Sequence, residues 1–471
     1  MKKFKYTSQI NLAILTVFAV MTVSCEREFS DDITLAKYPT TPEVFTDFPV
    51  GLTDQFFISF DPVSGANVNG FDVDNNSYKG TSAIRIDVPR TKDPDGGYIG
   101  GIFKDRGNGR DLTDYDALTF WAKGTTTANI DLFGFGLDFE GDNYSVGLED
   151  TRLSTNWKKY VIPIPDPSKL VQEKGVFSFS ACACSTLGNG YTFWIDEIRF
   201  EKLGNLAQPR PAIFNGNDEQ VLLFMEAKYD ISGTIQTISL GDGSDVTVSA
   251  AKAYFDYTSS DPYVAQVNEK GEVTVVGIGT AKITASLNGV EAAGSLTVEA
   301  YGSLPEVPSH DSANVISIFS DAYENVNIDF YNGYWKPYQT TTSADFDVNG
   351  DNILVYENFN FVGHQFSDPV VDATSMTHLH LDVLVPGEVP AGAKLKITIK
   401  DFGPDGKDSA SDDKTQDFTI NSADLTAKGW SSIDIPLTVT PRTKLGQFIF
   451  SDLDTGLLPS FYLDNVYFYK E

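Results

Sequence analysis

One short pattern occurs twice in the chain, each time at the end of a long segment rich in aromatic residues. It reads TFWIDEIRF at residues 192–200 and SFYLDNVYF at residues 460–468. Earlier landmarks recur in the same order, DLTDYDALTFWAKG with DATSMTHLHLDVLVPG and LSTNWKKYVIPIP with LTAKGWSSIDIPL. Similarity in order at this scale is typical of duplication. We therefore predict two copies of one sandwich whose first and last strands lie side by side.

The composition favours sheets over helices. The 471 residues include 33 Phe, 21 Tyr and 39 Gly, and helical periodicity is hard to find, so we predict an all-β chain of several domains. Two polar stretches containing proline, near residues 201–211 and 299–311, are typical of linkers. The predicted segments are 1–24 (signal peptide), 25–40 (tether), 41–205 (sandwich), 211–300 (small β-domain) and 312–471 (second sandwich).

The segment between the linkers has the most specific motifs. YTSSDPYVAQVNEKGEVTVVGIGTAKITASLNG, residues 257–289, predicts strand, turn, strand, turn and strand. Its Ser-Ser-Asp, Ala-x-Val, Gly-x-Val and Gly-x-Gly-Thr-Ala elements closely resemble group 2 bacterial Ig-like domains. The resemblance implies a small β-sandwich that serves as a spacer, and we place no binding site in it.

The N-terminus predicts export. Basic residues precede an apolar run from Leu12 to Val23 that is too short to span a bilayer. The run and Cys25 resemble a bacterial lipoprotein signal, although Thr22 stands where that signal prefers Leu; the alternative is an ordinary signal peptide. The polar EREFSDD that follows resembles the tether of Bacteroidetes lipoproteins on the outer face of the outer membrane. These resemblances imply acylation of Cys25 and a lipid-anchored cell-surface location.

The negative net charge argues against polyanionic partners. The formal net charge of −30 becomes −33 when Lys2, Lys3 and Lys5 leave with residues 1–24. A surface this acidic repels nucleic acid and anionic lipid. Cys182 and Cys184 would then be the remaining cysteines. They lie two positions apart on a strand-like pattern, which favours partly buried thiols over a disulfide.

The two outer segments resemble the jelly-roll carbohydrate-binding modules of glycan-degrading bacteria, especially those beside laminarinases. Such modules often hold a structural calcium where an Asp of the last strand meets an acid after the first strand. The resemblance therefore implies Asp196 with Asp61, and Asp464 with Asp321, as calcium ligands. The alternative is an Asp that caps or faces solvent at a strand end.

The sequence DFYNGYWKPYQ, residues 329–339, is the strongest candidate ligand site. Its periodicity cannot bury Tyr331, Tyr334, Trp335 and Tyr338 together, and exposed rings bind the apolar faces of pyranoses. Alternatively, two of these rings close the end of the sandwich. We expect a rim of neighbouring polar residues: Glu357, Asn360, His364 and Gln365.

A second candidate face lies on MTHLHLDVLV, where His380 and Asp382 alternate with buried leucines. The aligned outward residue in the first copy is Trp121, so we expect Trp121 and Asp382 at equivalent places in two clefts. His378 and His380 have no third ligand at a useful spacing, so we do not predict a metal site there.

No nucleophile motif or paired-acid signature of a glycosidase is evident, and we expect no catalysis and no catalytic cofactor. The predicted function is capture of polysaccharide, a β-glucan such as laminarin as the first candidate, for an outer-membrane glycan transporter complex. The alternatives are an adhesin for protein partners and a glycan-degrading enzyme.

Overall fold

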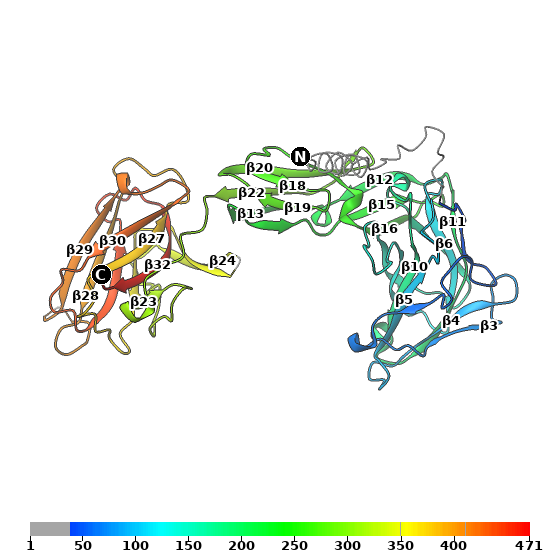
Figure 1. The fold of residues 1–471 in the computed structure, drawn as a ribbon, viewed down its shortest axis with the longest axis horizontal. Coiled ribbons are helices and arrows are strands. Elements are labelled where there is room, and N and C mark those ends of the chain that lie inside the picture. The colour runs from blue at the N-terminus through cyan, green and yellow to red at the C-terminus, as the bar shows by residue number, and fades with distance from the viewer. Residues whose placement is uncertain (1–37, 349, 410) are drawn as a thin grey trace, which may run out of the picture.

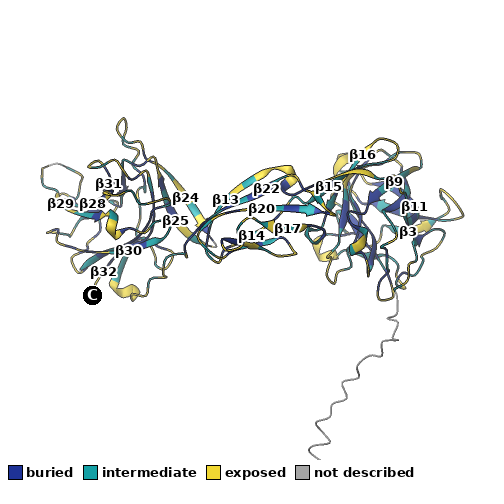
Figure 2. Ribbon diagram, turned by 90° about the horizontal axis from the view of Figure 1, so that it is seen from above, coloured by how far each residue is buried: buried dark blue, intermediate teal, exposed yellow. Residues whose placement is uncertain are grey.

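The computed structural model describes residues 38–471 except 349 and 410. The described chain forms three β-rich bodies in a row (Figure 1), and Figure 2 shows the same row from above, coloured by burial. The predicted signal peptide, Cys25 and the first part of the tether lie outside the described residues. In the part that is described, no helix is long and apolar enough to cross a membrane. The prediction of an all-β chain of sandwiches is confirmed.

The first sandwich packs two antiparallel sheets around a core rich in phenylalanine, including Phe120, Phe133, Phe177 and Phe193. One sheet has the order β3 (Phe71–Asp74), β4 (Ala83–Val88), β11 (Tyr191–Glu201), β6 (Ala117–Gly124) and β9 (Lys158–Pro163), and β1 (Glu43–Phe45) also pairs with β11. The other sheet contains, in order, β8 (Val146–Arg152), β7 (Asn129–Phe135), β10 (Gly175–Cys182), β5 (Tyr98–Lys104) and β2 (Ile58–Ser59).

The last sandwich repeats this connectivity, except that β2 has no counterpart in it. Its first sheet has the order β24 (Thr342–Val348), β25 (Asp351–Glu357), β32 (Ser460–Tyr469), β27 (His378–Leu384) and β30 (Trp430–Pro436), and β23 (Val315–Phe319) pairs with β32. Its second sheet has the order β26 (Phe361–Gln365), β31 (Leu445–Ser451), β28 (Lys394–Asp401) and β29 (Lys414–Asn421). The two sandwiches therefore have the same topology, as duplication requires.

A β-bulge explains the unusual pattern that ends each copy. In β11, Phe193 and Ile195 face the core, and the register then shifts after Asp196, where Glu197 has φ 50°. The extra residue returns Ile198 and Phe200 to the core side. In β32, Asn465 has φ 49°, and the residues on either side of it that face the core are Phe461, Leu463, Val466 and Phe468.

The middle body is a smaller sandwich. One sheet has the order β13 (Asp218–Phe224), β22 (Ser295–Tyr301), β20 (Gly279–Leu287) and β17 (Asp256–Ser259), and β21 (Val290–Glu291) also pairs with β20. The other sheet has the order β14 (Lys228–Asp230), β19 (Glu272–Val275) and β18 (Ala265–Val267). Three further strands, β12 (Ala207–Ala212), β15 (Ile235–Ser239) and β16 (Asp245–Ala250), join the first sandwich, because β16 pairs with β8. The first two bodies thus share one sheet and one core.

An aromatic cluster joins the middle body to the last one. Phe224 and Tyr301 pack against Leu384, Trp430 and Tyr462 of the last sandwich. The Phe224 ring lies 6.1 Å from Trp430 and 5.8 Å from Tyr301, centroid to centroid. This cluster occupies part of the outer face of the sheet that contains β27 and β32.

Candidate functional site

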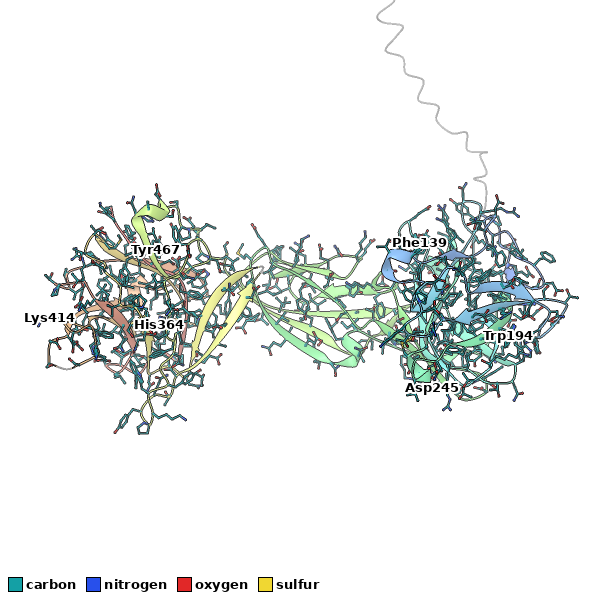
Figure 3. All side chains as sticks on the ribbon, turned by 90° about the horizontal axis from the view of Figure 1, so that it is seen from below. Phe139, Trp194, Asp245, His364, Lys414 and Tyr467 are labelled. Carbon is teal, nitrogen blue, oxygen red and sulfur yellow. A yellow bond between two sulfur atoms is a disulfide. The ribbon has the colours of Figure 1, made fainter. Side chains whose placement is uncertain are left out.

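The outer face of the first sheet in the first sandwich carries a lateral row of aromatic and charged side chains. Cross-strand pairing aligns Asp72 with Arg85, Arg85 with Trp194, and Trp194 with Lys123. Trp157, directly before β9, continues the row beside Lys123. Alternation along each strand places these five residues on the side of the sheet away from the core. Trp194 is labelled in Figure 3.

The row is braced by the chain between β3 and β4. The Tyr78 ring stacks on Trp121 with 3.8 Å between centroids, and Tyr78 also meets Trp157 edge to face at 6.0 Å. The Trp194 Nε1 donates to both carboxylate oxygens of Asp74, at 3.1 and 3.0 Å. These contacts fix the rings before any ligand binds, which lowers the entropy lost on binding.

Lys123 links the two tryptophans of the row. Its Nζ lies 4.9 Å from the Trp157 ring centroid and 5.4 Å from that of Trp194, and it donates to Asn76 Oδ1 at 2.6 Å. Together with Arg85 and Asp87, which form an ion pair of 2.9 Å, it places hydrogen-bonding groups beside ring surfaces. Rings flanked by such groups can hold a ligand that has apolar faces and polar edges, as a sugar ring has. We name Trp157, Lys123, Trp194 and Arg85, with Tyr78 over Trp121, the platform.

The same row in the last sandwich is apolar and covered. Register places Val355, Tyr462 and Leu384 where the first copy has Arg85, Trp194 and Lys123. Trp430 takes the place of Trp157, and Phe224 and Tyr301 pack against the row. The duplicated face has therefore diverged into a platform facing solvent in one copy and an interface between bodies in the other.

The predicted aromatic loop is only partly exposed. Tyr334 and Tyr338 are 54% and 78% exposed, whereas the Trp335 ring covers Gly363 and stacks on Phe361 at 6.2 Å. The prediction was wrong for Tyr331, because its ring packs on the core and its hydroxyl donates to the Ile318 carbonyl at 2.8 Å.

The predicted rim divides in the same way. Asn360 braces the loop, since its Nδ2 donates to the Tyr338 carbonyl and its Oδ1 accepts from Thr340 N. Glu357 is exposed at the end of β25, and Gln365 is half-buried beside Ser367. His364 is fully buried and lies 2.6 Å from the Tyr356 hydroxyl. Burial lowers the pKa of His364 to about 3, so its assignment to a rim was wrong.

His380 and Asp382 lie at the outer face of β27, under the linker. Asp382 pairs with Asp464 as Trp121 pairs with Asp196, so Trp121 and Asp382 occupy equivalent register positions. The His380 Nδ1 lies 2.9 Å from Asp434 and its Nε2 lies 3.6 Å from Asp382. Burial lowers the pKa of His380, but hydrogen bonds and attraction to the two carboxylates outweigh it, and the pKa is raised.

The acid pair predicted in the first copy is not formed. Asp61 is exposed and caps a 3-10 turn, Pro62–Ser64, by accepting from Val63 N. The acid near Asp196 is Asp47, which follows β1 as Asp321 follows β23. Asp196 accepts from Tyr78 N, Lys79 N and Glu197 N. Both of its oxygens are satisfied by amide donors, so this copy does not fit a cation site.

The acid cluster of the last copy, unlike that of the first, contains a carboxylate oxygen without a hydrogen-bond partner. Asp464 is 1% exposed, and its Oδ2 is buried without a hydrogen-bond partner among the described residues. Burial first, and then repulsion from Asp351, Asp382 and Asp321, raise the pKa of Asp464 to about 8. Burial and the neighbouring Asp321 also raise the pKa of Asp351 to about 6. Converging carboxylates with an unpartnered oxygen fit a hard divalent cation.

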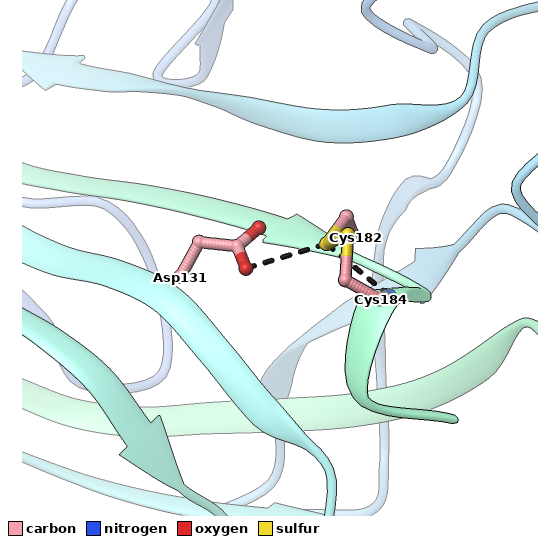
Figure 4. Close-up of side chains that lie close together, drawn as sticks. All are labelled: Asp131, Cys182 and Cys184. Atoms are coloured by element: carbon pink, nitrogen blue, oxygen red, sulfur yellow. Dashed lines mark hydrogen bonds between the residues drawn. A yellow bond between two sulfur atoms is a disulfide. The ribbon is translucent and has the colours of Figure 1, made fainter. Parts of the chain in front are cut away.

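The two cysteines form a disulfide, so the prediction of free thiols was wrong (Figure 4). Strand β10 ends at Cys182 and the chain turns into a 3-10 segment, Cys184–Thr186, which brings the two Cα atoms to 5.3 Å. A continuous strand would have pointed the side chains along one face at a greater separation. Asp131 Oδ1 lies 3.3 Å from the Cys182 sulfur.

Sequence reasoning found Trp121 but missed Tyr78, Trp157 and Trp194. Alternation in TFWIDEIRF separates Trp194 from Phe193 and Ile195, and the burial of those two residues shows that Trp194 faces outward. The row itself depends on pairing between strands that are distant in the sequence. The burial of His364 had a local signal, because Val362, His364 and Phe366 alternate in FVGHQF and all three face the core.

Comparisons with known proteins agree with the fold. Residues 57–202, which contain the platform, match the family model Carbohydrate binding domain 30, and residues 242–288 match the model Intimin, immunoglobulin-like domain. No curated protein matches the chain. The chain is thus an all-β protein with one segment similar to carbohydrate-binding modules and another similar to Ig-like domains.

Solved structures similar to the chain include several carbohydrate-binding modules. A family 30 module of a Clostridium thermocellum cellulosomal cellulase is 17% identical, with a TM-score of 0.24, and covers 35% of this chain and 98% of its own. A family 11 module from Clostridium thermocellum, in complex with a β-1,3-1,4-mixed-linked tetrasaccharide, is 13% identical, with a TM-score of 0.24, over 33% and 95%. A CBM22 tandem from Paenibacillus barcinonensis is 12% identical, with a TM-score of 0.23, over 93% and 100%.

Proposed function

We propose that this protein binds polysaccharide without cleaving it, and that the platform is its main binding surface. The observation that carries the proposal is the row of Trp157, Lys123 and Trp194 on an open sheet face, inside the segment that matches Carbohydrate binding domain 30. Ring surfaces take the apolar faces of sugar units, and Lys123 and Arg85 take hydroxyls. The exposed Tyr334 and Tyr338 would supply a second contact with glycan on the last sandwich.

The setting we propose is the bacterial cell surface. A lipid on Cys25 anchors the chain to the outer membrane, in the manner of Bacteroidetes surface lipoproteins, and the protein hands captured glycan to a transporter complex. A β-glucan such as laminarin is the first ligand to test. Two weak surfaces on one arm raise the effective concentration of a polymer and so its overall affinity.

Calcium is the cofactor we propose, in the last sandwich alone. Asp464 and Asp351 would hold it, since Asp464 Oδ2 lacks a partner among the described residues and the two acids repel each other. Asp321 lies beside them, but both of its oxygens already accept from Asn352. The role of the ion would be structural, because it would fix β25 to the last strand of the sandwich.

The test is affinity electrophoresis of the chain from residue 26 onward in gels that contain glucans, mannans, xylans or pectins. We expect retardation by at least one neutral polysaccharide and its loss in Trp194→Ala. Removing a central aromatic contact typically costs about 2 kcal/mol or more, which is roughly a thirtyfold loss of affinity. The matched control is Phe139→Ala, because Phe139 is an exposed ring on the loop after β7, which belongs to the other sheet.

Other results would redirect the proposal. Retardation that persists in Trp194→Ala but disappears in Tyr338→Ala would move the main site to the last sandwich. Absence of retardation by every glycan would favour the adhesin, and new reducing ends after long incubation would favour an enzyme.

A further inference from the structure

A cavity of about 490 Å³ lies between the linker and the last sandwich. Linker residues 302–310 form its outer wall, and the inner wall is formed by His380, Asp382, Trp430, Ser432 and Tyr467. Its volume lies within the range of ordinary small-molecule sites. The cavity is separate from the platform, which is on the first sandwich.

The linker is held at both ends and spans the cavity as a strap. At one end Gly302 N donates to the Lys428 carbonyl at 2.9 Å, and Leu304 packs on the aromatic cluster between the bodies. At the other end the His310 ring lies 4.3 Å from the Tyr469 ring, and Tyr323 donates to the His310 carbonyl. The strap is thus held over the cavity by contacts at both of its ends.

The inner wall offers a carboxylate oxygen that the protein leaves unused. Asp382 is 4% exposed and accepts from Asn465 through Oδ2, while its Oδ1 has no partner among the described residues. The Trp430 Nε1 also lacks a partner in the described part of the chain, but the nitrogen is inaccessible to solvent, so Trp430 offers the cavity its ring and not its N–H. Buried polar groups are ordinarily hydrogen-bonded, by protein, water or a ligand. A carboxylate oxygen left free at a cavity wall indicates an occupant that can donate a hydrogen bond, as a hydroxyl group does.

The wall also selects by charge. Asp382 and Glu306 line the cavity, Asp434 pairs with His380 behind it, and none of its described lining residues is Lys or Arg. Such a wall repels carboxylated or sulfated ligands. An ammonium ligand would have to compete with His380, which already contacts both Asp382 and Asp434. A neutral ligand with hydroxyl groups is neither repelled by the acids nor in competition with His380. Tyr467 and Trp430 supply ring surface for its apolar faces.

We propose that this cavity is a second sugar site, which takes one or two units of a neutral glycan and excludes acidic sugars. The inference rests on the proposed glycan-binding function and adds a site of a different shape. The platform is an open face suited to the middle of a long chain. The cavity, closed by the strap, suits a short oligosaccharide or a chain end.

The test is calorimetric titration of the chain from residue 26 onward. This chain carries Trp157→Ala and Trp194→Ala, two substitutions that disable the platform. The probes are laminaribiose and cellobiose, with a glucuronic acid disaccharide and a glucosamine dimer for comparison. We expect one site per chain for a neutral disaccharide. Adding Ser432→Trp, which fills the cavity, should weaken binding at least tenfold. Thr438→Trp adds the same bulk farther along the same chain segment, outside the cavity, and should leave binding unchanged.

A second variant is needed because Ser432→Trp could weaken binding by disturbing the fold. Asp382→Asn keeps the shape of the side chain and should also weaken binding at least tenfold, with an unchanged circular dichroism spectrum to show that the fold is kept. Absence of any disaccharide site, binding that survives Ser432→Trp, or stronger binding of the acidic or amino disaccharide would each overturn the inference. Those results leave the proposed function intact, since it depends on the loss of gel retardation in Trp194→Ala.

Discussion

Asp464 is the residue whose ionisation most affects the last sandwich. Burial raises its pKa to about 8 in the folded chain, whereas an unfolded Asp ionises near about 3.9. Between those values the folded state binds more protons than the unfolded state, so the free energy of unfolding falls as pH rises. Asp351, with its pKa raised to about 6, contributes in the same direction.

We therefore expect the last sandwich of the metal-free protein to melt at a lower temperature at pH 8 than at pH 5. Asp464→Asn, which removes the charge and keeps the shape, should reduce this difference, and Asp351 and His380, whose pKa values are also raised, account for the remainder. Scanning calorimetry with a chelator present measures both effects. A metal-free protein whose melting temperature is equal at both pH values would contradict the raised pKa.

Calcium should reverse the loss at pH 8. An ion that binds only the folded state stabilises it by about 2.7 kcal/mol at a hundredfold excess over Kd, which corresponds to a rise of roughly 5–10 °C for a domain of this size. Asp196→Asn in the first copy is the comparison, because Asp196 is satisfied by amide donors, and the shift with calcium should survive it. A shift in melting temperature that requires Asp196 and not Asp464 would place the ion in the first sandwich and contradict this prediction.

At the scale of the element, the bulge in the last strand is what lets each copy place an acid inside a sheet. Glu197 adopts φ 50° in a strand, a conformation that L-residues avoid at a cost of about 1–2 kcal/mol. We expect Glu197→Val to be less stable than Glu197→Gly by at least about 1 kcal/mol, because glycine accepts positive φ freely and valine does not. Both variants lose the ion pair with Arg199, so urea denaturation of the two isolates the backbone effect. Equal midpoints would mean that the bulge relaxes.

The strands themselves could be predicted from the sequence, but their partners could not. Alternation in ALTFWAKG and TFWIDEIRF is a local property, and so are the turns between strands. The alignment of Lys123 with Trp194, and of Trp157 beside Lys123, depends on hydrogen bonding between distant segments. The bulge after Asp196 shifts the register by one residue, which flips the face of every residue beyond it. The aromatic loop 329–339 was visible because its residues are adjacent in the sequence, although the fold buries Tyr331.

At the scale of the whole molecule, the joints decide how far apart the binding surfaces lie. The first two bodies share a sheet, and Phe224, which is fully buried, joins the middle body to the last. Effective concentration along a polymer depends on the distance and stiffness between its sites. A stiff arm presents the platform and the surfaces of the last sandwich at a fixed spacing, which favours polymers long enough to reach both.

Phe224→Ala should loosen the joint with the last sandwich. Truncating a buried Phe costs about 3–5 kcal/mol, and here the loss falls on ring contacts to Trp430 and Tyr301. We expect a larger radius of gyration in solution scattering, and a calorimetric transition of the last sandwich that separates from that of the first two bodies. Polysaccharide affinity should fall while affinity for a disaccharide at the platform stays unchanged, because the loss concerns spacing and not contact. Ile397→Val in the core of the last sandwich is the control, since it lowers stability by about 0.5–1.5 kcal/mol without touching the joint. If Phe224→Ala left scattering and polysaccharide affinity as they were, the arm would owe its stiffness to contacts other than this cluster.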